Sequence, residues 1–184
     1  MRAFVAIDLD PGIRGAVQAL IGRLEATRAD VRWAGPAGLH LTLKFLGEID
    51  EAAFKRAQAV LGRVASRHRA FPLVAQGTGV FPGERNPRVL WIGFAAEPGL
   101  AALQDELERT LETEGFPRED RPFRPHLTLG RVKGPVRIAD ALTELERRRD
   151  EVFGRMTADR VALFESRLGP AGADYRIVAE ARLA

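Results

Sequence analysis

A four-residue phrase that occurs twice constrains this chain most strongly. The residues His-Leu-Thr-Leu stand at positions 40–43 and again at 126–129, although the chain has only 3 histidines. In each copy leucines alternate with polar residues, which is typical of a strand with one buried face. Side chains two residues apart in a strand lie on one face, about 7 Å apart. Each copy therefore predicts an imidazole and a hydroxyl on the same face of a strand.

The composition predicts a globular domain without a membrane span. The chain has 184 residues, of which 46% are hydrophobic and 29% charged, and this is enough to bury a sizeable core. No apolar run approaches the length of a membrane span, and the N-terminus does not have the pattern of a signal peptide. The absence of cysteine excludes disulfides, thiolate metal sites and a cysteine nucleophile. We expect one cytoplasmic domain over residues 1–184, monomeric and with no obligate protein partner.

Hydrophobic periodicity and turn signals predict four helices and about eight strands, which is an α+β chain. Asp10 and Asp50 are the expected N-caps of the first two helices. The helices are expected at residues 10–27, 50–69, 97–111 and 139–150. The strands are expected at residues 1–9, 31–33, 39–46, 71–80, 89–94, 126–132, 156–168 and 174–183. Residues 81–87 are expected to form an exposed loop, and residues 169–172 a turn.

The sequence also indicates an internal duplication. Asp-Pro-Gly-Ile at residues 10–13 recurs as Glu-Pro-Gly-Leu at residues 97–100, at almost the spacing that separates the two histidine motifs. The repeated halves would cover about residues 1–80 and 88–168. Two repeats cannot form a solenoid. They can form two lobes of mainly antiparallel sheet, related by a pseudo-two-fold axis, with the helices outside and the motifs facing each other across a central cleft.

Two imidazoles and two hydroxyls in one site suit the hydrolysis of a phosphodiester. One neutral imidazole can accept the proton of water while a charged one gives a proton to the leaving oxygen. The hydroxyls of Thr42 and Thr128 can donate to the phosphate oxygens, although both could be ordinary strand residues. No HxxxH or HExxH pair occurs, so we expect neither a metal nor another cofactor. His68, at the basic end of a helix, is expected to be structural.

These motifs support a family resemblance. Residues 39–47 (LHLTLKFLG) and 124–131 (RPHLTLGR) resemble the paired motifs of the two-histidine (2H) phosphoesterase superfamily. The resemblance is closest to its branch of RNA 2′,3′-cyclic phosphodiesterases, also called 2′-5′ RNA ligases, and spans nearly the whole chain. It implies conversion of a 2′,3′-cyclic phosphate on an RNA end, such as that of a tRNA fragment, to a 2′-phosphate, with reversible ligation as a related reaction. It implies His40 as proton donor and His126 as proton acceptor, roles that the two similar motifs alone do not distinguish.

Strand alternation does not place two further candidate residues, Phe45 and Arg131, on the site face. The resemblance implies that Phe45 stacks on the terminal base, and Arg131 is a candidate third phosphate ligand. Strand alternation places each of them on the face opposite to its motif histidine, so each requires a bend in its strand. The nearby basic residues could form a lip for RNA or a solvated loop. These basic residues are Arg118, Arg121, Arg124, Arg131 and Lys133.

Two other functions remain open on the sequence. One is a phosphodiesterase for small cyclic nucleotides such as ADP-ribose 1″,2″-cyclic phosphate. The other is a module that binds RNA ends without turnover. Catalysis is favoured over binding alone, because a binding site would not require two imidazoles in a chain so rich in arginine.

Overall fold

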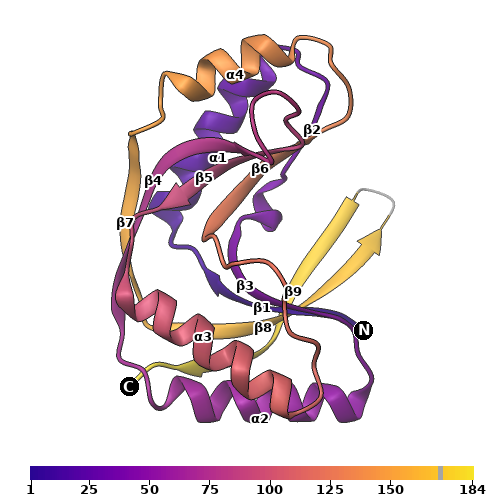
Figure 1. Ribbon diagram of the computed structural model, residues 1–184, viewed down its shortest axis with the longest axis vertical. Coiled ribbons are helices and arrows are strands. Elements are labelled where there is room, and N and C mark those ends of the chain that lie inside the picture. Colours follow the sequence, from indigo (N-terminus) through magenta and orange to yellow (C-terminus); the bar gives the residue numbers. More distant parts are fainter. Residues whose placement is uncertain (170–171) are drawn as a thin grey trace.

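The computed structural model describes residues 1–169 and 172–184, and in this part of the chain it contains four α-helices and two antiparallel sheets (Figure 1). The prediction of an α+β fold is therefore confirmed. The helices are α1 (Pro11–Glu25), α2 (Glu51–Ala65), α3 (Pro98–Thr113) and α4 (Ile138–Glu146), with a 3₁₀ turn η1 (Pro36–Gly38). The strands are β1 (Arg2–Asp8), β2 (Val31–Trp33), β3 (His40–Glu48), β4 (Phe71–Phe81), β5 (Val89–Phe94), β6 (His126–Val132), β7 (Val152–Ala158), β8 (Arg160–Gly169) and β9 (Gly172–Arg182).

Each sheet combines strands from both halves of the sequence. The four-stranded sheet has the order β3-β1-β8-β9, and the five-stranded sheet has the order β2-β6-β5-β4-β7. In both sheets a motif strand pairs with the first strand of its own half, β3 with β1 and β6 with β5. The halves at about 1–80 and 88–168 thus do not build one sheet each. The duplication itself stays a prediction.

The helices cover the outer faces of the two sheets. Helices α2 and α3 pack together against the four-stranded sheet, whereas α1 contacts β7 and α4 contacts β4 of the five-stranded sheet (Figure 1). The predicted caps of the first two helices are confirmed. The carboxylate of Asp10 accepts a hydrogen bond from the backbone N–H of Ile13 at 2.8 Å, and that of Asp50 accepts one from Ala53 at 2.7 Å. The stripe of α1 that faces the core consists of Ile13, Val17, Leu20, Ile21 and Leu24.

Several predicted elements differ from the structure, and among them the second helix ends at Ala65 rather than at residue 69. The single strand expected over residues 156–168 is two strands, because the chain leaves the five-stranded sheet at Ala158 and enters the four-stranded sheet at Arg160. The last helix ends at Glu146 rather than at Asp150, because the chain must turn there before β7 pairs with β4. The predicted turn at residues 169–172 includes residues 170 and 171, which lie outside the described residues. Among the described residues, no helix is both long enough and apolar enough to span a membrane.

Candidate functional site

The two motif strands meet where the two sheets approach each other. Strand β3 is the edge strand of the four-stranded sheet and contacts β6 of the five-stranded sheet. The leucines of both motifs are buried, with at most 4% of their surface exposed, whereas the histidines and threonines are half-buried. This is the alternation that the sequence predicts. His40, Thr42, His126 and Thr128 thus each lie on the side of their strand that faces away from the buried leucines, on two strands that contact each other.

A β-bulge in the first motif strand changes the placement of Phe45. The pairing of β3 with β1 skips two residues of β3, Leu46 and Leu43, and the bulge at Leu43 leaves both Leu43 and Lys44 pointing into the core. The residues that face one another across β1 and β3 are Phe4 with Phe45, Ala6 with Thr42 and Asp8 with His40. Because alternate residues of β1 share one face, Phe45 lies on the same face as His40. The expectation from simple alternation was wrong, and the ring of Phe45 is 58% exposed on the site face.

An equivalent bulge in the second motif strand moves Arg131. Here the extra residue is Leu129, and both Leu129 and Gly130 are buried. The residues that face one another across β5 and β6 are Val89 with Arg131, Trp91 with Thr128 and Gly93 with His126. Arg131 therefore shares the face of His126, contrary to simple alternation. Gly130 is the local signal for this bulge, since a side chain there would come within 2.5 Å of Val31.

The imidazole of His40 is enclosed by aromatic rings. It stacks on Phe4 with ring centroids 4.5 Å apart, and it also contacts Phe164 at 5.3 Å and Tyr175 at 5.0 Å. Within the described residues, its buried Nδ1 has no hydrogen-bond partner. Burial lowers the pKa of His40 from 6.5 to about 4, an effect that the carboxylate of Asp8 partly opposes. In this ligand-free state His40 is neutral near pH 7.

The imidazole of His126 is held differently. Its Nδ1 lies 2.7 Å from the backbone carbonyl oxygen of Arg124, and because a carbonyl can only accept, Nδ1 carries the hydrogen. In the neutral ring, Nε2 is then the free proton acceptor. The ring of Phe81 packs against this imidazole in a T-shaped arrangement at a centroid distance of 5.0 Å. Burial lowers the pKa of His126, the hydrogen bond to the Arg124 carbonyl raises it, and the charge of Arg131 lowers it further.

Sequence reasoning missed the charged groups near His40. Asp8 pairs with His40 across the strands, and the guanidinium of Arg14 lies 2.6 Å from the carboxylate of Asp8. Arg14 also donates to the carbonyl of Pro36 at 2.7 Å, which ties down the 3₁₀ turn just before the motif. These contacts join a strand, a helix and a turn, so no spacing in the sequence points to them. Phe81 was missed as well, because it was assigned to an exposed loop.

A buried ion pair connects the first motif strand with helix α3. Lys44 and Glu108 are 3% and 5% exposed, and the Lys44 Nζ donates to Oε1 of Glu108 at 2.5 Å. Lys44 also donates to the carbonyl of Pro117, and the same carboxylate oxygen of Glu108 accepts from the backbone N–H of Glu119 at 2.7 Å. Strand β3, helix α3 and the segment leading to His126 are thereby held together. A lysine inside a strand carried no signal of this role in the sequence.

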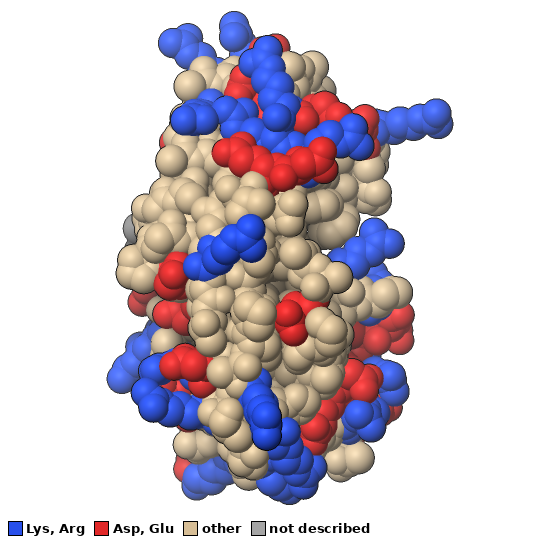
Figure 2. All heavy atoms as spheres, turned by 90° about the vertical axis from the view of Figure 1, so that its left-hand side faces the viewer, with Lys and Arg blue, Asp and Glu red and all other residues tan. Residues whose placement is uncertain are grey.

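The basic residues around the second motif are of two kinds. Arg118 lies 3.5 Å from Glu112, and Lys133 lies 3.4 Å from Asp30, so both have acidic partners. Within residues 1–169 and 172–184, the remaining three form no ion pair and are exposed. These three are Arg121, Arg124 and Arg131. By contrast, acidic and basic side chains are interspersed on the face that lies on the left in Figure 1, with single charged side chains set in uncharged surface near its middle (Figure 2).

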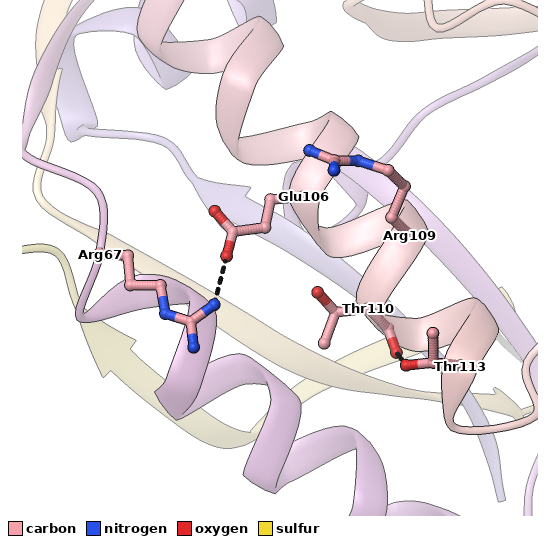
Figure 3. Close-up of a pocket in the computed structure, with 5 residues that line it drawn as sticks. All are labelled: Arg67, Glu106, Arg109, Thr110 and Thr113. Atoms are coloured by element: carbon pink, nitrogen blue, oxygen red, sulfur yellow. Dashed lines mark hydrogen bonds and ion pairs between the residues drawn. The ribbon is translucent and has the colours of Figure 1, made fainter.

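A separate pocket lies between α2 and α3, on the outer side of the molecule (Figure 3). Its two arginines are paired with acids, Arg67 with Glu106 at 2.9 Å and Arg109 with Asp105 at 2.9 Å. His68 lies 2.7 Å from Glu106 beside this pocket, away from both motifs. Across the described residues, no group of three or more His, Asp or Glu side chains is arranged to hold a metal ion.

Comparison with known proteins gives a consistent result. The model of the 2′-5′ RNA ligase superfamily matches residues 12–170. The chain is 40% identical, over 95% of each sequence, to an RNA 2′,3′-cyclic phosphodiesterase of Methanothermobacter thermautotrophicus. It is 36% identical to the protein of that name from Archaeoglobus fulgidus, over 96% of this chain and 97% of the relative.

Solved structures extend the similarity to the fold. The protein TT0787 of Thermus thermophilus superposes with a TM-score of 0.85 at 32% identity, covering 100% of this chain and 98% of the other. E. coli LigT, in its complex with 3′-AMP, superposes with a TM-score of 0.80 at 26% identity, again covering 100% and 98% of the two chains.

Proposed function

Because this chain belongs to the 2′-5′ RNA ligase superfamily, we propose that it hydrolyses the 2′,3′-cyclic phosphate of RNA ends to a 2′-phosphate without a metal or other cofactor. The observation that carries this proposal is the matched pair of bulged strands. Each strand presents a histidine, a threonine and one further side chain on its site face, namely Phe45 in β3 and Arg131 in β6. Such a set supplies a proton acceptor, a proton donor and phosphate ligands.

In the proposed reaction, His126 acts as the general base. Its Nδ1–H is committed to the Arg124 carbonyl, so Nε2 is available to take a proton from water. The water oxygen attacks phosphorus, the bond from phosphorus to the 3′ oxygen breaks, and the 2′ ester remains. Thr42, Thr128 and Arg131 donate to the non-bridging oxygens, where negative charge increases during attack. Phe45 supports the terminal base from its exposed position on the same face.

His40 gives its proton to the departing 3′ oxygen. A neutral imidazole cannot do this, and burial keeps the pKa of His40 at about 4 in the free protein. A bound phosphate allows His40 to be protonated, because a negative charge beside the ring favours the imidazolium and raises the pKa of His40. The donor is thus charged only when the substrate is in place.

The direct test is hydrolysis of an oligonucleotide that ends in a 2′,3′-cyclic phosphate, in excess chelator, by the wild type and by His40→Ala and His126→Ala. We expect turnover by the wild type, a 2′-phosphate as product, and a loss of about 10²- to 10⁴-fold in each variant. Full activity in either variant would contradict the assignment. Loss of wild-type activity in chelator, with recovery on adding a divalent metal, would contradict metal independence.

The same site accounts for ligation if the 5′-hydroxyl of a second RNA takes the place of water. We propose that the chain acts as a monomer, since one chain supplies both motifs and the surrounding side chains. Light scattering of the active protein tests this point. A cytoplasmic location stays a prediction from the sequence.

A further inference from the structure

An arginine outside both motifs lies on the face of the candidate site. Arg32 is the middle residue of β2, and its neighbours Val31 and Trp33 pack into the core. Since strand side chains alternate, Arg32 points to the opposite side. It pairs directly with Arg131 across β2 and β6, and paired residues share a face. Arg32 therefore lies beside Arg131, on the side that carries His126.

Among the residues that the structure describes, the two guanidinium groups have no counterion. Like charges directly opposite each other on neighbouring strands repel. Both arginines are exposed, and neither forms an ion pair within the part of the chain that the structure describes. Asp30, the nearest acid along β2, is engaged by Lys133 at 3.4 Å. The same row of the sheet continues through Val89 to Phe81, which carry no charge. An anion is the partner that this arrangement lacks.

The position of Arg32 determines which phosphate group of a bound substrate it can contact. His126 and Thr128 precede Arg131 along β6, and Arg32 lies one strand further out, about 5 Å beyond Arg131. The reacting phosphate, held by the motif side chains and Arg131, is thus more distant from Arg32 than from Arg131. A second phosphate of the same substrate is the group that can bridge to the outer arginine.

We propose that Arg32, together with Arg131, binds the 5′-phosphate of the terminal nucleotide, which in RNA is the phosphodiester that joins this nucleotide to the rest of the strand. The inference rests on the proposed function and narrows the class of substrates. A site for a second phosphate favours the end of an RNA chain over a nucleoside cyclic phosphate that has a free 5′-hydroxyl.

The test compares two small substrates, a nucleoside 2′,3′-cyclic phosphate with a 5′-hydroxyl and the same compound with a 5′-phosphate. For the wild type we expect a kcat/KM about tenfold or more higher for the 5′-phosphorylated substrate, the effect of a charged hydrogen-bonded contact. Arg32→Gln should lose this preference while turnover of the 5′-hydroxyl substrate stays within about twofold. The dependence of kcat/KM on salt should also become shallower in this variant, for the 5′-phosphorylated substrate alone.

Arg109→Gln is the matched control, since it removes the same charge from the outer pocket of Figure 3. It should keep the preference and the salt dependence of the wild type. Hydrolysis of both substrates without a preference, or an unchanged preference in Arg32→Gln, overturns the inference and leaves the proposed function standing. If the wild type hydrolyses neither these substrates nor a cyclic-phosphate-ended oligonucleotide, the proposed function fails and the inference fails with it.

Discussion

At the scale of single residues, the two histidines have the same neighbours in sequence but different surroundings in space. His40 is packed among the rings of Phe4, Phe164 and Tyr175, and its buried Nδ1 has no partner in the described residues. His126 has its Nδ1 fixed by a backbone carbonyl. The sequence predicted which residues form the site, whereas their protonation depends on residues far away in the chain. The donor and acceptor roles could not be separated from the motifs for this reason.

His40→Phe should abolish activity and stabilise the fold. A phenyl ring keeps the stacking and removes an unsatisfied buried nitrogen. Since the pKa of His40 is about 4 in the folded protein and 6.5 in the reference state, the unfolded chain binds the extra proton as the pH falls from about 6.5 to 4. The wild type therefore loses stability on acidification, by up to about 3 kcal/mol.

Urea unfolding near pH 7 and near pH 4.5 measures this effect. The variant should have the higher free energy of unfolding, with the larger difference at the lower pH. His40→Ala serves as the control variant because it lacks the ring, and it should be less stable than the wild type at the higher pH. A phenylalanine variant that is less stable than the wild type at both pH values would refute the account of His40.

The proton-donor role makes a separate prediction about the pKa of His40. Titration of its ring by NMR should give a value of about 4 in the free protein. A bound nucleoside 2′-phosphate should raise this pKa, because the phosphate charge favours the imidazolium. The ring signals of His68, whose partner is Glu106 at the outer pocket, serve as an internal control and should not change when the nucleotide is added at a fixed pH. An unchanged pKa of His40 in the complex would argue against it as the donor.

At the scale of elements, the bulges at Leu43 and Leu129 decide which residues reach the site. Alternation along an isolated strand predicted the faces of the histidines and threonines but failed for Phe45 and Arg131. The extra residues, Leu43 and Leu129, are defined by pairing with β1 and β5, and this information is not local. Only Gly130 gave a local hint. Strand identity was thus predictable from periodicity, while register was not.

Lys44→Met tests the connection between the elements that carry the motifs. The variant leaves Glu108 buried without its cation, and we expect a loss of about 3–5 kcal/mol in the free energy of unfolding. Replacing both residues, as Lys44→Met with Glu108→Leu, should restore much of the stability because no charge is then buried. Urea unfolding of the three proteins provides the measurement.

Lys55→Met is the matched control, since its exposed pair with Glu51 on α2 should contribute less than about 1 kcal/mol. If Lys44→Met is no more destabilising than Lys55→Met, the buried pair does not hold these elements together.

At the scale of the whole molecule, the chain crosses between the sheets several times. The sequence predicted the fold class, the four helices and most strands, because these follow from local periodicity and caps. It did not predict which strands share a sheet. The change of sheet at Asp159, inside what looked like one continuous strand, depends on the partners β4 and β1 that the two parts find.

This interleaving predicts that both sheets unfold together. Both tryptophans, Trp33 and Trp91, belong to the five-stranded sheet, so their fluorescence reports on that sheet. Phe164→Ala removes a buried ring from the other sheet and should lower the free energy of unfolding by about 3–5 kcal/mol. The midpoint should shift equally by tryptophan fluorescence and by far-UV circular dichroism. A fluorescence midpoint that stays at the wild-type value would show that the sheets unfold separately.

The position of β1 has a consequence for synthesis on the ribosome. This strand is made before its neighbours β3 and β8, and β8 begins only at Arg160. Phe164 and Tyr175, which enclose His40, come from the same late segment (Figure 1). A nascent chain therefore exposes both motifs long before it can complete the surroundings of the first histidine. We therefore expect the proposed activity to begin only once β8 and β9 have left the exit tunnel.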